Sequence, residues 1–190
     1  MKKQGKLIII TAPSGSGKST IINRLIQDDN LRLQFSVSAT TRPRRGDEQH
    51  GKEYYFLTLD EFNKAIENDE LVEYQEVYPG RFYGTLKSEI KRINKLGNNA
   101  MLDIDVIGAL NVKKLYGDHA LAIFIKAPSI EVLRERLVKR GTDSPEDIEN
   151  RINKAEFELK FATQFDHIVV NDILDDAVNQ AHQLITEFIK

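Results

Sequence analysis

Leu7-Ile-Ile-Ile-Thr-Ala-Pro-Ser-Gly-Ser-Gly-Lys-Ser-Thr-Ile-Ile-Asn-Arg-Leu-Ile26 is the stretch that decides the fold of this chain. Its first four residues are apolar and predict a buried strand, whereas the apolar residues from Ile21 onward recur with helical spacing. Between them lies a loop rich in glycine and serine. A strand, a glycine-rich loop and a helix in this order are typical of a phosphate-binding loop in an α/β fold.

The residue types in this loop suit a phosphate. Gly15 and Gly17 can adopt positive φ and bring backbone N–H groups close to phosphate oxygens. Lys18 would lie between the last two phosphates, and the Ser19 hydroxyl is the expected ligand of Mg²⁺. The motif departs from G-x-x-x-x-G-K-[ST] only at Ala12. The alternative is a turn that happens to contain a lysine, but the flanking strand and helix favour a nucleoside triphosphate site.

Composition excludes several classes of protein. The 190 residues suffice for a single domain, and 41% apolar and 29% charged residues are ordinary for a globular protein. A net charge of −2 argues against broad binding to nucleic acid or an anionic membrane. Cysteine is absent, which excludes disulfides and thiolate metal sites. The four histidines are scattered without the spacing of metal ligands. No apolar run could span a membrane or form a signal peptide, so we expect a cytoplasmic protein.

Strand-like and helix-like segments alternate, which predicts a parallel sheet covered by helices. The predicted strands are residues 7–10, 100–103, 121–125 and 167–170, and the predicted helices are residues 19–27, 106–116, 130–139 and 175–189.

Two regions interrupt this alternation. Residues 36–87 contain short alternating pieces, turn signals and one helix starting at Asp60, which predicts a small mixed β insertion. Residues 131–153 are helical and charge-dense, with a loop in which Ser144 can cap a helix that has Pro145 at its first position. This second region is expected to form a mobile lid.

Three arginines lie within four positions in Ser36-Val-Ser-Ala-Thr-Thr-Arg-Pro-Arg-Arg-Gly46. A guanidinium group can donate two parallel hydrogen bonds to the oxygens of one phosphate, and the hydroxyls of Tyr54 and Tyr83 can add neutral donors. The segment therefore suits a phosphate grip. The alternative is a solvated basic loop balanced by Asp47 and Glu48.

Asp103 and Asp105 follow an apolar strand, at the carboxyl edge of the sheet where open α/β folds bind ligands. A carboxylate there can hold the water shell of Mg²⁺. The alternative for Asp105 is that it caps the next helix.

Arginines also gather in the predicted lid. Arg136 and Arg140 lie four residues apart, hence on one face of a helix, and Arg134 and Arg151 are nearby. Paired cations of this kind become favourable when a polyphosphate lies between them. The alternative is a set of exposed charges that pair with Glu131, Glu135 and Glu149.

Seven motifs in order make the chain resemble guanylate kinases over essentially its whole length. They are residues 12–20, Ser36-Val-Ser-Ala-Thr-Thr-Arg42, Gly51-Lys-Glu-Tyr-Tyr-Phe56, Phe82-Tyr-Gly-Thr85, Leu102-Asp-Ile-Asp105, Arg136-Leu-Val-Lys-Arg-Gly-Thr142 and Val170-Asn-Asp172. The resemblance implies transfer of the γ-phosphoryl group of ATP to GMP with Mg²⁺. It also implies one domain over residues 1–190, with a P-loop core (1–35, 88–130 and 154–190), a mixed β GMP-binding region (36–87) and a helical lid (131–153).

The resemblance also implies roles for individual residues. ATP would contact Ala12, Pro13, Ser14, Gly15, Ser16, Gly17, Lys18, Ser19, Thr20 and, near the adenine, Asn171. The GMP phosphate would contact Arg42, Arg45, Tyr54 and Tyr83, and the guanine would face Ser38, Glu73 and Thr85, with Asp103 and Asp105 around GMP and Mg²⁺. The catalytic set would be Lys18, Arg42, Arg136, Arg140 and Arg151, and the metal ligands would be Ser19 and Asp103, partly through water.

The base assignment has independent chemical support. Guanine presents two adjacent donors that the Glu73 carboxylate can accept together, and its O6 needs a donor such as Ser38 or Thr85. Adenine would leave these groups unpaired, which predicts selectivity for GMP over AMP.

The chain departs from the family pattern at Ala12 and Ile107, where glycine and glutamine are usual, and in the order Arg42-Pro-Arg-Arg45. The moved proline leaves open which of Arg44 and Arg45 binds the phosphate. The segment from Glu73 to Tyr83 is one residue longer than in some relatives, which a bulge or a longer turn at Pro79-Gly80 would absorb.

Three other functions are less consistent with the sequence. Non-catalytic guanylate-kinase-like scaffold domains generally have a degraded phosphate loop, whereas Lys18 and Ser19 are present here. A P-loop kinase for another acceptor, such as a ribose bisphosphate, would not need Glu73, and a GTPase would carry an Asn-Lys-x-Asp motif. We expect ATP and GMP as partners, without nucleic acid, membrane or an obligate protein partner.

Overall fold

The computed structural model describes residues 5–190, which form two compact units. We call Leu7–Leu33 together with Met101–Lys190 the core unit, and Gln34–Ala100 the insertion unit. A five-stranded sheet has the order β2-β7-β1-β8-β9, and a four-stranded sheet has the order β4-β3-β6-β5. The α/β class and the mixed β insertion predicted from the sequence are confirmed.

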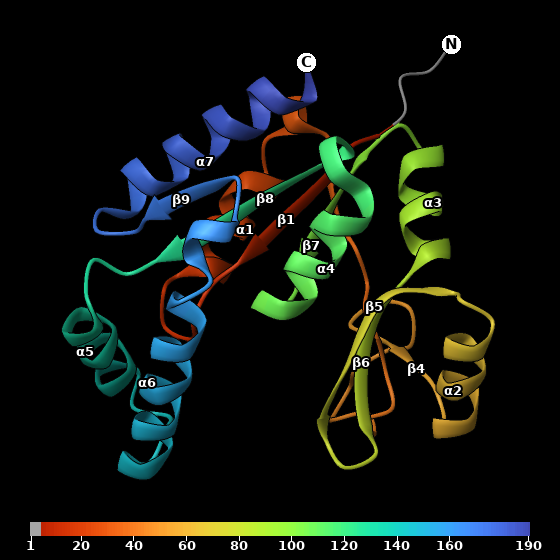
Figure 1. The fold of residues 1–190 in the computed structure, drawn as a ribbon, viewed down its shortest axis with the longest axis horizontal. Coiled ribbons are helices and arrows are strands. Elements are labelled where there is room, and N and C mark those ends of the chain that lie inside the picture. Colours follow the sequence, from red (N-terminus) through yellow and green to blue (C-terminus); the bar gives the residue numbers. More distant parts are fainter. Residues whose placement is uncertain (1–4) are drawn as a thin grey trace. The chain divides into compact units, whose positions relative to one another are not determined.

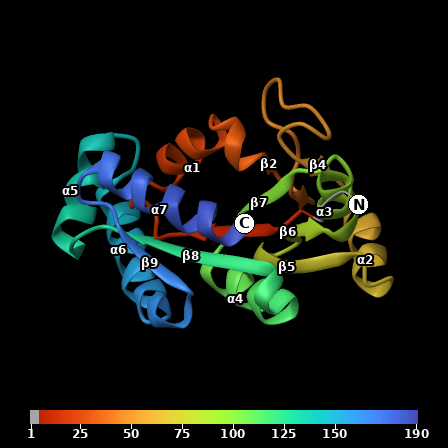
Figure 2. The same ribbon diagram turned by 90° about the horizontal axis from the view of Figure 1, so that it is seen from above.

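The core unit is built on β1 (Leu7–Thr11), whose five residues are all buried. It pairs in parallel with β8 (Ala120–Lys126), which in turn pairs in parallel with β9 (His167–Val170). Figure 2 shows α1 (Lys18–Ile26) and α7 (Leu174–Ile189) on one face of these strands and α4 (Val106–Tyr116) on the other. Because helices cover both faces, β1 and β8 are apolar at every position except the last.

The predicted lid is a helical hairpin, α5 (Ile130–Arg140) and α6 (Pro145–Leu159), which lie side by side in Figure 1. Apolar residues hold the pair together around Leu133, Leu137 and Ile152. Ser144 caps α6 in a reciprocal capping box with Asp147, and Pro145 occupies the first turn. The local prediction for this helix start is therefore confirmed.

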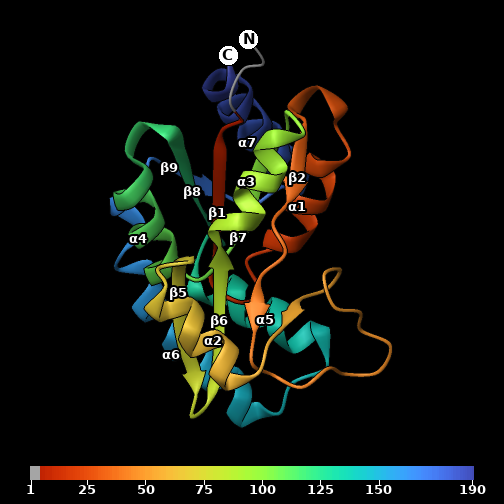
Figure 3. The ribbon, with the colours of Figure 1, turned by 90° about the vertical axis from the view of Figure 1, so that its right-hand side faces the viewer.

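The insertion unit contains β3 (Ala39–Thr40), β4 (Tyr55–Phe56), α2 (Leu59–Glu67), β5 (Leu71–Tyr78), β6 (Arg81–Leu86) and α3 (Lys87–Lys95). Its sheet packs against α2 through a small core that includes Phe62 and Leu71. The register of β5 against β6 shifts between Glu76 and Tyr78, beside the Pro79-Gly80 turn. Figure 3 shows the chain between β3 and β4 as a long excursion from this sheet.

Outside the predicted β insertion, one strand and one helix were not predicted: β2 (Leu33–Phe35) and α3. β2 is only three residues long, and α3 buries only two apolar side chains, Ile90 and Ile93, so neither element contains a long apolar run. The strands and helices predicted for the core occur with ends shifted by no more than one residue. No helix within residues 5–190 combines the length and the apolar character that a membrane span needs.

Candidate functional site

The loop between β1 and α1 requires glycine at two positions. Gly15 and Gly17 have φ of 88° and 87°, in the left-handed region that disfavours other residues. A Cβ on Gly17 would lie 2.2 Å from Nδ2 of Asn171. That amide donates a hydrogen bond of 2.8 Å to the carbonyl oxygen of Ser16, so a buried side chain from beyond β9 fixes the shape of the loop.

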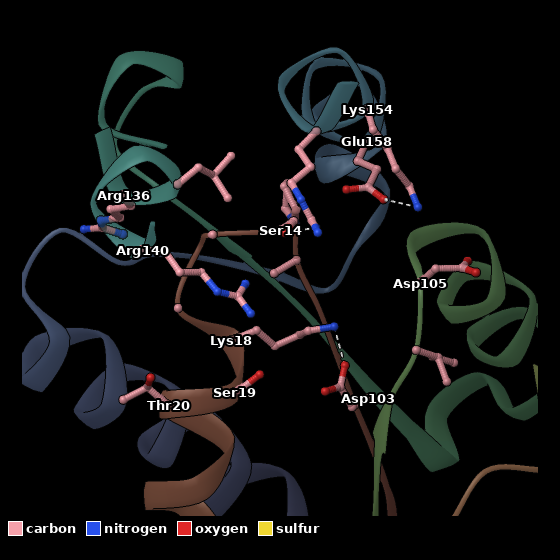
Figure 4. A pocket seen from close by; sticks show the side chains of 17 residues that line it. Ser14, Lys18, Ser19, Thr20, Asp103, Asp105, Arg136, Arg140, Lys154 and Glu158 are labelled. Atoms are coloured by element: carbon pink, nitrogen blue, oxygen red, sulfur yellow. Dashed lines mark hydrogen bonds and ion pairs between the residues drawn. The ribbon is translucent and has the colours of Figure 1, made fainter. Parts of the chain in front are cut away.

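A cavity of about 710 Å³ opens over this loop within the core unit (Figure 4). Its lining comes from the loop, the end of β7 (Asn99–Asp103) and the lid helices. The residues are Ala12, Pro13, Ser14, Gly15, Gly17, Lys18, Ser19, Thr20, Asp103, Ile104, Asp105, Arg136, Leu137, Arg140, Arg151, Lys154 and Glu158. The loop residues predicted to bind a triphosphate therefore line one cavity, except Ser16, which is buried.

The two predicted acidic residues have different surroundings. Asp103 forms an ion pair with the Lys18 ammonium on the cavity wall. Asp105 accepts a hydrogen bond of 2.8 Å from the Gly108 N–H and caps α4, as the alternative interpretation expected. Both nevertheless line the cavity, so a capping role does not remove Asp105 from it.

Three of the four lid arginines line the cavity. Arg136 donates to the carbonyl oxygen of Asn171 at 2.9 Å, and Arg151 donates to the Ser14 hydroxyl at 2.9 Å. Figure 4 shows the Arg140 guanidinium reaching toward Lys18. Arg134 instead pairs with Glu149 and follows the alternative of exposed, mutually paired charges. The hairpin therefore directs Arg136, Arg140 and Arg151 to the phosphate loop.

A smaller hollow of about 210 Å³ lies beside the same loop. Arg136, Asn171, Asp172 and Leu174 line it together with loop residues. Asn171 uses its amide nitrogen to hold the loop, and whether it also contacts an adenine stays a prediction.

Two charged lining residues, Lys154 and Glu158, were not predicted from the sequence. Their spacing from Arg151 places all three on one face of α6, but that signal alone does not separate them from solvated helix charges. Glu158 is 7% exposed, and burial raises the pKa of its carboxyl group. Lys154 is its ion-pair partner, with 3.8 Å between Nζ and Oε1.

In the insertion unit, Arg42 is buried and its guanidinium group is held by hydrogen bonds to Glu48 and to the backbone of Pro43. Glu48 accepts from both terminal nitrogens at 2.8 Å, and the Pro43 carbonyl oxygen accepts at 2.7 Å. The hydrogen bonds from Arg42 lower the pKa of Glu48 to about 2, and the same carboxylate raises the pKa of Arg42. Glu48, assigned from the sequence only to charge balance, thus orients the arginine.

Aromatic side chains complete this cluster. The Arg42 guanidinium carbon lies 5.1 Å from the centre of the Tyr54 ring, and the Tyr54 and Tyr83 rings are 5.9 Å apart. The structure therefore brings together Arg42, Tyr54 and Tyr83. The Arg45 side chain is exposed, while its backbone N–H donates to Glu48 at 2.8 Å. Arg44 lies over the Phe56 ring. Which of Arg44 and Arg45 binds the phosphate stays open.

The residues predicted to face guanine lie on neighbouring strands. Glu73 on β5 is opposite Thr85 on β6, and the Thr85 hydroxyl donates to Glu73 at 2.7 Å. Thr85 is buried and Glu73 partly so. Ser38 is held by its carbonyl oxygen, which accepts from the Tyr55 N–H at 2.8 Å. Recognition of guanine by these residues stays a prediction.

The cavity contains oxygen ligands of the kind that Mg²⁺ prefers. The Ser19 hydroxyl and the Asp103 carboxylate both line it. Within residues 5–190, no group of three or more His, Cys, Asp or Glu residues could hold a metal by itself. Such a sparse set fits Mg²⁺, which keeps several waters and shares its coordination with phosphates.

Comparisons with known proteins agree with this geometry. The family model for guanylate kinase matches residues 4–188. Guanylate kinases from Bacteroides thetaiotaomicron and Porphyromonas gingivalis are 57% and 58% identical, over 97% of this chain and 90% and 98% of their own lengths. A crystal structure of guanylate kinase from Anaplasma phagocytophilum has a TM-score of 0.75 at 30% identity, covering 100% of this chain and 89% of that chain. The chain therefore belongs to the guanylate kinase family.

Proposed function

We propose that this protein transfers the γ-phosphoryl group of ATP to GMP and releases ADP and GDP. One observation carries the proposal: the phosphate loop, Lys18 and three lid arginines line a single cavity. Such an arrangement of backbone N–H groups and cations suits a polyphosphate rather than a neutral ligand. Membership of the guanylate kinase family over nearly the whole chain points to GMP as the acceptor.

On the donor side, the loop N–H groups and Lys18 bind the phosphates, while Arg136, Arg140 and Arg151 neutralise the charge that develops during transfer. Asn171 holds the loop through Ser16 and lines the smaller hollow, which is where the adenine would bind. Bound Mg²⁺, held by Ser19 and through water by Asp103, would offset the negative charge of the phosphates.

On the acceptor side, the GMP phosphate binds Arg42, Arg45, Tyr54 and Tyr83. Glu48 takes one edge of the Arg42 guanidinium, which turns the remaining N–H groups toward Tyr83. The guanine faces Ser38, Glu73 and Thr85, with Glu73 accepting from the two adjacent donors of the base. Asp103 and Asp105 border GMP and the metal. A base without those donors would leave Glu73 unpaired, which disfavours AMP.

The transfer is in-line and passes through no phosphoenzyme. An oxygen of the GMP phosphate attacks the γ-phosphorus, the bond from that phosphorus to the β–γ bridging oxygen breaks, and ADP leaves with the electron pair. The attacking phosphate is already an anion, so no general base is required. Closure of the lid, residues 131–153, excludes water that would otherwise compete as acceptor.

We further propose that the protein acts in the cytoplasm, on ATP and GMP alone. The net charge of −2 supports the absence of nucleic-acid and membrane partners. A scaffold role without catalysis is disfavoured because the intact phosphate loop lines a cavity with Lys18 and the lid arginines.

A coupled assay of ADP release tests the proposal. The full chain is given ATP and Mg²⁺ with GMP, AMP, UMP or CMP as the acceptor. We expect rapid release with GMP and only background release with the other three. Equal rates with GMP and AMP would contradict the guanine pocket, and ADP release independent of any acceptor would contradict a kinase.

A further inference from the structure

One face of α6 carries two charged residues whose role the family assignment leaves open. Lys154 and Glu158 follow Arg151 at intervals of three and four residues, and all three line the phosphate-loop cavity. Figure 4 shows the Lys154 and Glu158 side chains extending from α6 into this cavity, joined by their ion pair. They therefore face the same space as Lys18 and Asp103.

Glu158 is a buried carboxylate with little compensation. Its side chain is 10% exposed, and within residues 5–190 its one ion pair is with Lys154, at 3.8 Å. Burial raises its pKa, opposed by the charges of Lys154 and Lys18, while Asp105 raises it further. A carboxylate in these surroundings needs a cation beside it to stay ionised.

Lys154 is the exposed member of the pair. Its side chain is 69% exposed, and a separation of 3.8 Å lies near the limit for an ion pair, so the contact is weak. An ammonium group on a four-carbon stem can turn to a stronger anion without rearranging the helix. A triphosphate offers several charged oxygens, and contacts with such oxygens are shorter and stronger than this one.

We propose that Lys154 is a further contact for the polyphosphate of ATP, and that Glu158 is the counter-ion it leaves when the nucleotide binds. Arg151, one turn earlier on the same helix, already reaches the loop through Ser14. Lys154 thus adds a second cation from α6 to the donor side. The inference rests on the proposed function, because the polyanion in the cavity is taken to be ATP.

Calorimetric titration of ATP into the full chain, in the presence of Mg²⁺ and the absence of GMP, tests the contact directly. Lys154→Gln is expected to weaken ATP binding by about tenfold, the loss of one charge-assisted hydrogen bond. Lys154→Arg should restore most of the affinity. Lys160→Gln is the matched control, because Lys160 is an exposed lysine at the end of the same helix and lies outside the cavity lining. Equal affinities of the Lys154→Gln and Lys160→Gln variants would overturn the proposal.

Glu158→Gln tests the exchange of partners. Without the carboxylate, Lys154 has no counter-ion to leave, so ATP should bind about threefold more tightly. Weaker binding would contradict the exchange and would make Glu158 a residue that holds Lys154 in place. Thermal unfolding of each variant checks that it is folded.

Failure of this inference and failure of the proposed function are distinguishable. If wild-type protein releases ADP in the presence of GMP but Lys154→Gln binds ATP normally, only the role of Lys154 is wrong. If wild-type protein binds ATP and depends on Lys154 but does not phosphorylate GMP, the acceptor assignment is wrong and the donor contact stands.

Discussion

Two buried glutamates, one in each unit, differ sharply in their surroundings. In the insertion unit, Glu89 accepts two hydrogen bonds from Arg92 at 2.8 Å, one from the Tyr55 hydroxyl at 2.9 Å and one from the Val37 N–H at 3.3 Å. In the core unit, Glu158 has one ion pair with another described residue, Lys154, at 3.8 Å. Burial raises the pKa of both, but the bonds to Glu89 reverse the effect and hold its pKa below the usual value, whereas the pKa of Glu158 stays raised.

The cationic side chains Arg42, Arg140 and Lys154 also differ in how firmly they are paired. Arg42 is 6% exposed and fixed by a two-bond contact with Glu48, so its orientation is established before a ligand arrives. In the cavity, Arg140 is exposed and Lys154 is weakly paired. The comparison teaches that Arg42 on the proposed acceptor side is preorganised, whereas Arg140 and Lys154 on the donor side are left free to gather around a polyphosphate.

Lys18→Ala gives the strongest test of the donor side. Lys18 follows the glycine loop and pairs with Asp103, and its ammonium would stabilise the transferring phosphoryl group. We expect kcat to fall by about 10²–10³-fold, in the range seen when one positioned electrostatic donor is removed, with the fold intact. Steady-state rates and circular dichroism measure the two effects. Near wild-type turnover would contradict the proposed mechanism.

Arg42→Ala probes the preorganised side. Removing the guanidinium group takes away a proposed contact to the GMP phosphate and leaves Glu48 beside an incoming anion. We expect kcat/KM for GMP to fall by about 10²-fold, with little change in the KM for ATP. If the KM for ATP rose as much as the KM for GMP, Arg42 would not act on GMP alone, and the assignment of separate donor and acceptor residues would be contradicted.

Much of this arrangement is predictable from the sequence because it depends on local signals. The apolar run before the loop, Ser144 with Pro145, and the spacing of Arg136 and Arg140 each act over a few residues. The roles of Glu48, Glu89 and Glu158 are not predictable in this way. Each depends on which cation the tertiary structure places beside the carboxylate, and an exposed glutamate looks the same in the sequence.

The role of Asp105 was also not predictable from the sequence. Its position before α4 supports both a helix cap and a ligand contact, and the structure contains the cap while also placing the residue at the cavity. Sequence spacing cannot decide between the two roles, because a single carboxylate at a strand end can serve both.

Glu89→Gln should weaken the insertion unit. The variant keeps the shape of the side chain but removes the charge that pairs with Arg92, and because Arg92 is 45% exposed, solvent screening limits the cost to about 2 kcal/mol in the free energy of unfolding. Because the pKa of Glu89 is lower in the folded state, its contribution is present above the usual glutamate value and is lost as the pH falls through its lowered pKa. Chemical denaturation between pH 3 and 7 should show the variant and wild type converging at low pH. The exposed Glu67→Gln is the control, and an equal effect there would contradict this role.

Glu158→Gln should raise the free energy of unfolding, opposite to Glu89→Gln, and its effect should be the smallest of the four. The pKa of Glu158 is raised in the folded state, so the folded protein holds a proton more tightly than the unfolded chain does. Stability therefore falls as the pH rises from the usual glutamate value through the raised pKa, and the amide removes this fall. We expect a gain of about 1 kcal/mol at pH 7, partly offset by the lost pair with Lys154, and no gain at low pH. Glu156→Gln, exposed on the same helix, should change little. If Glu158→Gln destabilised the protein as much as Glu89→Gln does, the two carboxylates would be equally compensated, and the contrast between the two buried glutamates would not hold.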